Sequence, residues 1–156
     1  MRDIKYIVVH CTATPVTATI ESIRRYWKEV LKWKNPGYHY IIKRNGEIEN
    51  IHAEENISNG VAGFNKNAIH ISYIGGISES GKAFDNRTDQ QRKSLYEKLL
   101  ELSAKYPDAQ ILGHRDFSPD KNGNGVIEYF EWIKGCPAFD VKDWLEHYRP
   151  EFSKAA

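Results

Sequence analysis

Three separate segments of the chain carry side chains that could bind a metal ion together. They are His10 near the N-terminus, His114 in the second half and Cys136 closer to the C-terminus. Two imidazoles and one thiolate form a ligand set of catalytic zinc sites, in which the fourth position stays open for water. Lys134 lies two residues before the cysteine and could place a cation beside that open position. This set predicts a metal-dependent hydrolase.

The spacing of these residues alone leaves a structural alternative open. A single histidine at a strand end is more often a hydrogen-bonded structural residue, and spacing does not show that the three segments meet. Cys11 directly follows His10, but neighbouring side chains of a strand point to opposite faces, so we expect Cys11 to be a small core residue. A Cys11–Cys136 disulfide is the less favoured alternative, since isolated bridges are rare in reducing compartments.

The strands that must position these residues are visible as apolar runs between turn signals. Residues 5–12 are β-branched and apolar without alternation, which is typical of a central strand covered on both faces. Residues 68–74 have the same character, and residues 110–113 form a short strand that ends at His114. An Asn-Gly turn at 45–46 predicts a hairpin between 38–43 and 47–51.

Three helices are expected from capping signals and apolar spacing. The first spans Thr19 to about Leu31, the second follows a capping box at Thr88 and ends near Lys105, and the last is capped by Asp140. The apolar face of the first helix consists of Ile20, Ile23, Trp27 and Val30. We therefore expect one α/β domain, with a central mixed β-sheet flanked by helices on both faces.

The composition gives no support to several classes of protein. The chain has 156 residues, 40% of them hydrophobic, and a net charge of +1, so nothing favours nucleic-acid binding. No apolar stretch is long enough for a membrane span, and the first residues lack the pattern of a signal peptide. We expect synthesis in the cytoplasm. The oligomeric state is not predicted.

Five motifs occur along the chain in a fixed order: His10-Cys11-Thr12-Ala13-Thr14, Gly37-Tyr38-His39-Tyr40-Ile41-Ile42, Asn67-Ala68-Ile69 with Gly75-Gly76, Gly113-His114-Arg115-Asp116 and Lys134-Gly135-Cys136-Pro137. Together they resemble the zinc-dependent N-acetylmuramoyl-L-alanine amidases, a family that includes amidase-type phage lysozymes and peptidoglycan recognition proteins. The resemblance covers the chain from about Ile4 to Trp144.

The resemblance implies a role for each matching residue. His10, His114 and Cys136 would bind Zn²⁺, and Tyr38 and Lys134 would be catalytic, although each of the last two taken alone is more often a packed aromatic or a surface charge. The reaction would be hydrolysis of the amide between N-acetylmuramic acid and L-alanine in peptidoglycan or muropeptides. A phage endolysin released onto the wall and an enzyme of cytoplasmic muropeptides both fit, and a non-catalytic peptidoglycan-binding module is the alternative.

The remaining histidines have no such motif support. His39 should face away from Tyr38 and be structural, and His52 and His147 match no motif. His70 stands where the family usually has a small residue, and we expect it to pack.

The segment between His114 and Cys136 is longer than in compact phage amidases. Residues 120–131 match an EF-hand loop, with candidate Ca²⁺ ligands at Asp120, Asn122, Asn124, Ile127 and Glu131. Asparagine in place of two acidic ligands lowers the charge, and a polar Asn/Gly loop is the alternative. We expect an amidase domain over residues 1–150 that contains this loop, followed by a tail at 151–156.

Overall fold

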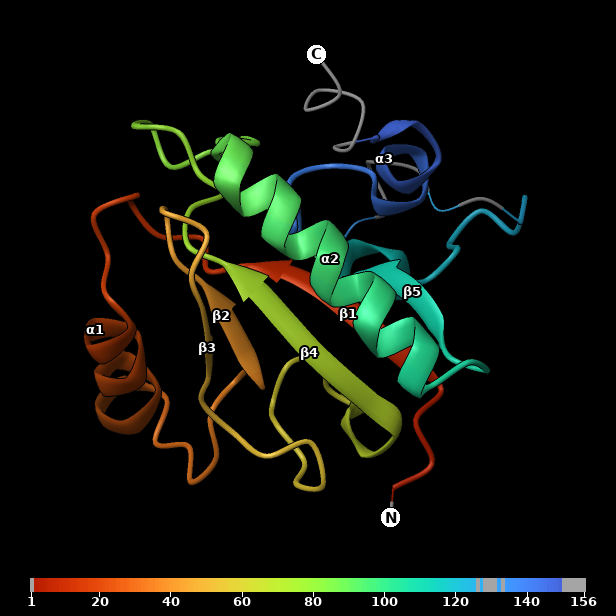
Figure 1. Cartoon of the computed structure of the whole chain (residues 1–156), viewed down its shortest axis with the longest axis horizontal. Coiled ribbons are helices and arrows are strands. Elements are labelled where there is room, and N and C mark those ends of the chain that lie inside the picture. The colour runs from red at the N-terminus through yellow and green to blue at the C-terminus, as the bar shows by residue number, and fades with distance from the viewer. Residues whose placement is uncertain (1, 126, 128–131, 133, 150–156) are drawn as a thin grey trace.

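A five-stranded mixed sheet forms the centre of the molecule (Figure 1). The computed structural model describes residues 2–125, 127, 132 and 134–149. Across the sheet the strands follow the order β3-β2-β4-β1-β5. Strand β1 pairs in parallel with β4 and β5, β2 pairs in parallel with β4, and β3 is antiparallel to β2. The bounds of the strands are β1 Tyr6–Cys11, β2 Tyr40–Ile42, β3 Ile48–Asn50, β4 Ala68–Tyr73 and β5 Gln110–Gly113.

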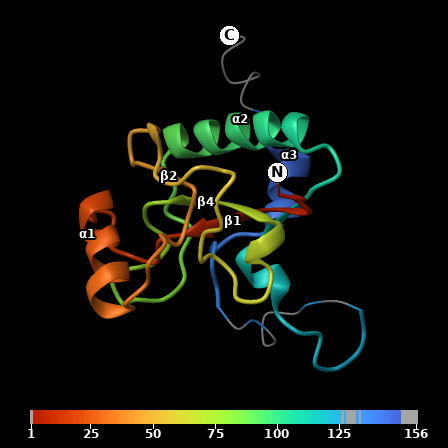
Figure 2. The same cartoon turned by 90° about the horizontal axis from the view of Figure 1, so that it is seen from below.

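Helices cover both faces of this sheet, as predicted (Figure 2). Helices α2 (Asp89–Lys105) and α3 (Val141–His147) pack on one face, where the main core lies between Leu95, Leu99 and Leu102 and the strands. Helix α1 (Ile20–Arg25) packs on the other face, with Ile20 and Ile23 against Ile41 of β2. Among the described residues, no helix combines the length and the apolar character that a membrane crossing needs.

Capping residues set the helix starts where the sequence predicted them. The Thr88 hydroxyl accepts a hydrogen bond from Gln91 N–H, and the Gln91 side chain accepts one from Thr88 N–H. The Asp140 carboxylate accepts from Asp143 N–H at the start of α3. These contacts satisfy backbone donors that have no partner inside a helix.

The first helix differs from the prediction in its last turn. After Arg25 the chain forms a π-helical turn, Tyr26–Val30, in which Leu31 N–H donates to Tyr26 C=O. Trp27 is buried, but Val30 is 61% exposed, so its prediction as part of the buried face is wrong. The wider turn of a π-helix moves later residues around the axis, out of the face that α-helical spacing predicts.

Strand β1 has one side facing the main core and the other side facing His10 and its surroundings. Ile7, Val9 and Cys11 point into the core beneath α2, whereas Val8 packs on the opposite face. Because side chains alternate along a strand, His10 lies on the same face as Val8. The predicted core role of Cys11 is confirmed, and His10 is buried on the face of the sheet that carries α1.

Candidate metal centre and its surroundings

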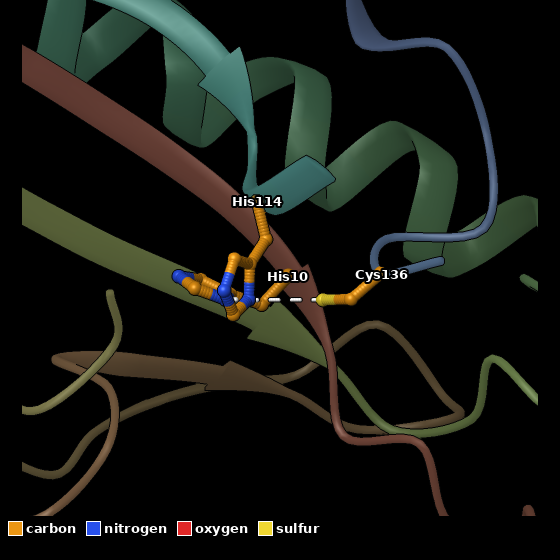
Figure 3. A group of neighbouring side chains, drawn as sticks. All are labelled: His10, His114 and Cys136. Carbon is orange, nitrogen blue, oxygen red and sulfur yellow. Dashed lines mark hydrogen bonds between the residues drawn. The ribbon is translucent and has the colours of Figure 1, made fainter. Parts of the chain in front are cut away.

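His10, His114 and Cys136 meet at the carboxyl ends of β1 and β5 (Figure 3). His10 lies in β1, His114 directly follows β5, and Cys136 comes from the loop before α3. Their ligand atoms all lie within 4.8 Å of one another. Cys136 Sγ is 3.8 Å from His10 Nδ1. Within the part of the chain that the structure describes, this is the only cluster of three or more such groups.

These distances fit a zinc ion. Zinc–sulfur and zinc–nitrogen bonds in a tetrahedral site hold the two ligand atoms about 3.5 Å apart. The Cys136–His10 separation of 3.8 Å is close to this value. Both cysteines are free thiols, so the donor set of two nitrogens and one sulfur is intact. The residues present therefore match a three-ligand zinc site in geometry and chemistry.

Burial keeps the two imidazoles in the form that binds metals. Burial lowers the pKa of His10 well below its usual value, and the neighbouring histidines and Lys134 lower it further. Burial, followed by the charge of Lys134, lowers the pKa of His114 to about 4. A neutral imidazole has a free nitrogen lone pair, which metal coordination requires.

Backbone contacts hold Cys136 in place. Arg115 N–H donates to Cys136 C=O at 2.9 Å, and the Tyr73 hydroxyl donates to Pro137 C=O at 2.6 Å. Cys11 N–H donates to Cys136 Sγ at 3.1 Å. Burial raises the pKa of the Cys136 thiol, while this N–H donor and Lys134 act in the opposite direction. A bound cation would favour the thiolate still more.

Tyr38 and Lys134 line the same cavity as the three clustered residues. The cavity has a volume of about 580 Å³. The Tyr38 ring centroid lies 5.0 Å from that of His10, and its hydroxyl donates to Cys11 C=O at 3.2 Å. Burial, followed by the nearby thiols, raises the pKa of Tyr38, so its hydroxyl stays protonated at neutral pH and acts as a donor. Lys134 is exposed at the cavity wall.

His70 is the residue at this site that the sequence did not assign. Its Nδ1 lies 2.8 Å from His10 Nε2, so it contacts a residue of the cluster instead of only packing. The signal in the sequence was a polar residue inside an apolar strand, but the pairing of β4 with β1 could not be read from it. His39 has the expected structural role, since its Nδ1 accepts from His70 N–H and its Nε2 contacts Asn56 C=O.

The described part of the predicted calcium loop contains turn contacts. The Asp120 carboxylate accepts from Gly123 N–H and Gly125 N–H, and Asn122 Oδ1 accepts from Asn124 N–H. Such contacts hold a polar turn without an ion and do not support calcium binding. Ile127 is half-buried, and Glu131 lies outside the described residues. Residues 150–156, with the predicted tail, also lie outside them.

Comparisons with known proteins agree with this geometry. Residues 1–125 match the family model described as N-acetylmuramoyl-L-alanine amidase. A Haemophilus influenzae protein is 52% identical over 86 residues, which are 55% of this chain and 74% of that protein. The endolysin of Escherichia phage T7 is 35% identical over 142 residues, covering 90% of this chain and 84% of that endolysin.

Solved structures show the same fold. The Ph2119 endolysin from the Thermus scotoductus MAT2119 bacteriophage Ph2119 superposes with a TM-score of 0.72 at 26% identity, covering 94% of this chain and 85% of that protein. The family model spans most of this chain, and the T7 relative spans nearly all of it. The chain belongs to the N-acetylmuramoyl-L-alanine amidase family, and it is an amide hydrolase of peptidoglycan.

Proposed function

We propose that the chain is a zinc-dependent endolysin in which His10, His114 and Cys136 hold the ion. The observation that carries this proposal is the convergence of two neutral imidazoles and a thiol in one cavity with Tyr38 and Lys134. The reaction is hydrolysis of the amide that joins the lactyl group of N-acetylmuramic acid to L-alanine. Zinc in such a site supplies Lewis acidity, which activates water near pH 7 and polarises a carbonyl group.

The two side chains beside the cluster then act on the substrate. The Lys134 ammonium is exposed in the cavity and stabilises the negative charge that develops on the carbonyl oxygen. The protonated Tyr38 hydroxyl can donate a hydrogen bond to the substrate and orient the scissile amide. Its present acceptor, Cys11 C=O at 3.2 Å, holds the hydroxyl near the cluster.

Two cavities share a wall beside the cluster, and together they offer space for an extended substrate. A second cavity of about 490 Å³ also has His114 and Lys134 in its wall, together with Trp33 and Gly60. These four residues also line the first cavity. A substrate that occupies both cavities would cross the cluster, as cleavage in the middle of a glycan–peptide junction requires.

The endolysin setting follows from the relatives. The T7 protein is named an endolysin and is similar along 90% of this chain. Action on the wall after release from the host cytoplasm fits this relationship. A non-catalytic binding module is the weaker alternative, because the metal donors, Tyr38 and Lys134 are all present around one cavity.

Mass analysis of digested cell walls tests the proposed reaction. Purified peptidoglycan is incubated with the zinc-loaded chain and with Cys136→Ser, which keeps the size of the side chain but removes the sulfur ligand. We expect the wild type to release stem peptides with a free L-alanine amino group and to leave intact glycan strands. The variant should release none. Wall binding by the wild type without release of peptide would instead favour the binding module.

A further inference from the structure

The second ring nitrogen of His10 contacts the buried His70 ring, which in turn contacts the half-buried Asn65 side chain. His10 Nε2 lies 2.8 Å from His70 Nδ1, and His70 Nε2 lies 2.8 Å from Asn65 Oδ1. We propose that His70, oriented by Asn65, fixes His10 in the tautomer that leaves Nδ1 free for the metal. His70 is thus a positioning residue of the amidase site, and this role rests on the proposed function only in naming zinc as the ion.

The direction of each hydrogen bond follows from a backbone donor at the end of the chain. Val61 N–H can only donate, and it lies 2.7 Å from the same Asn65 oxygen. That atom is therefore the carbonyl oxygen of the amide, and it accepts from His70 as well. His70 must then carry its proton on Nε2, since an oxygen without hydrogen cannot donate.

The protonation of His70 determines that of His10. Among the described residues no acidic side chain is hydrogen-bonded to either buried ring, so each ring is neutral and carries one ring proton. With the His70 proton on Nε2, His70 Nδ1 is an acceptor, and His10 Nε2–H donates to it. His10 Nδ1 is left unprotonated, and this is the atom that faces Cys136 Sγ at 3.8 Å.

The surrounding backbone is shaped to hold His70. The ring is fully buried, and its backbone N–H donates to His39 Nδ1 on the neighbouring segment. A Cβ atom on Gly60 would come within 2.3 Å of His70 Nδ1, far inside van der Waals contact. Only glycine at position 60 therefore leaves room for the His70 ring.

Such outer contacts commonly decide how a histidine ligand is presented. A ring held by its second nitrogen keeps one tautomer and one orientation, and loss of the partner typically weakens metal binding about 10- to 100-fold. Here the partner is an imidazole from the adjacent strand β4. Its removal should therefore change the ligand nitrogen of His10 without changing any residue of the cluster itself.

Nitrogen NMR of the metal-free full-length chain tests the tautomer directly. Long-range proton–nitrogen correlations of the labelled histidine rings distinguish protonated from unprotonated ring nitrogens. We expect His10 and His70 both to be protonated on Nε2 and unprotonated on Nδ1. A wild-type His10 that carries its proton on Nδ1 would overturn the inference. This measurement needs neither zinc nor activity, so its result is independent of the proposed function.

Two amide substitutions, each of which matches the position of one ring nitrogen, separate positioning from packing. The amide of His70→Asn places an acceptor near the position of Nδ1, whereas the amide of His70→Gln places it near Nε2. We expect His70→Gln to weaken zinc affinity about 10- to 100-fold relative to the wild type, measured by chelator competition. His70→Asn should retain most of the wild-type affinity. Equal losses in both variants, or no loss in His70→Gln, would overturn the positioning role.

A third variant keeps His70 and moves it. Gly60→Ala should push the ring away and allow both protonation patterns of His10 in the NMR spectrum. Circular dichroism monitors folding of each variant. If the wild type bound no zinc at all, the metal named in the proposed function would be wrong. The NMR measurement of the His10 tautomer would still test the positioning role of His70.

Discussion

Lys134 and the three clustered residues have different proposed roles, so their substitution should have different effects. At the residue scale, Lys134 has an exposed side chain at the cavity wall, whereas His10 and Cys136 have their ligand atoms turned toward each other. Lys134 nevertheless influences the cluster, because its charge is the second cause, after burial, of the low pKa of His114. Its proposed part is electrostatic stabilisation of the substrate, not metal binding.

Replacing Lys134 with alanine should therefore separate the two roles. We expect Lys134→Ala to keep one zinc per chain and to slow peptide release about 100-fold, as for loss of one oxyanion contact. Lys142→Ala, at an exposed lysine of α3, is the matched control and should keep full activity. Elemental analysis and timed digestion measure both quantities. Loss of zinc in Lys134→Ala would show that the lysine supports the metal instead.

At the element scale, the sequence predicts local structure well and pairing between elements poorly. The bounds of α2 and the cap of α3 follow from side chains a few residues apart, so capping boxes and apolar spacing reveal them. The π-turn after Arg25 depends on backbone packing and leaves no such pattern. The proposed metal ligands could be named through ordered motifs, whereas His70 could not be assigned because its contact depends on strand register.

The Arg87 side chain, which is paired with Asp85, packs on the aromatic rings of the segment that follows Cys136. The Arg87 guanidinium lies 3.4 Å from the centroid of the Phe139 ring and 4.7 Å from that of Trp144. Asp85 binds it through two contacts of 2.9 and 3.0 Å. Only 2% of the Arg87 side chain is exposed. A buried cation therefore joins the loop before α2 to the start of α3.

Removing the carboxylate should leave this cation without its ionic partner. We expect Asp85→Ala to lower the free energy of unfolding by about 3 kcal/mol, since breaking one half of a buried pair leaves an uncompensated charge. Urea denaturation measures the change. Glu21→Ala breaks the exposed pair with Arg25 and should cost less than about 0.5 kcal/mol. Equal losses of unfolding free energy in the two variants would contradict a stabilising role of the Asp85–Arg87 pair.

At the scale of the whole molecule, the buried imidazoles of His10, His39 and His70 and the half-buried imidazole of His114 lie near one another. Burial is the largest cause that lowers the pKa of His10, His39, His70 and His114, and it brings His39 and His114 to about 4. The folded chain therefore holds these rings neutral at pH values where an unfolded chain, with pKa values of about 6.5, would bind protons. Protonation then favours unfolding.

The metal-free protein should accordingly lose stability as the pH falls from about 6.5 towards 4. Each ring contributes up to about 1.4 kcal/mol per pH unit, so several kcal/mol should be lost between pH 7 and pH 5. Glu54 adds little between pH 7 and pH 5, because its carboxyl binds protons mainly below pH 5 even in the unfolded chain. Although burial opposes it, hydrogen bonds from Lys105, Tyr106 and Tyr40 lower its pKa to about 2. Urea denaturation with a chelator at both pH values gives the result, and equal stability would contradict neutral buried rings.

Adding zinc back to metal-free protein is the strongest test of the proposed site. The chain is stripped with a chelator, and zinc is added back in measured equivalents while the release of stem peptide from peptidoglycan is followed. We expect no release without metal, a rise in proportion to added zinc and a plateau at one ion per chain, with Cys136→Ser inactive throughout. Full release by the stripped chain, or a wild-type plateau shared by Cys136→Ser, would contradict a zinc site formed by His10, His114 and Cys136.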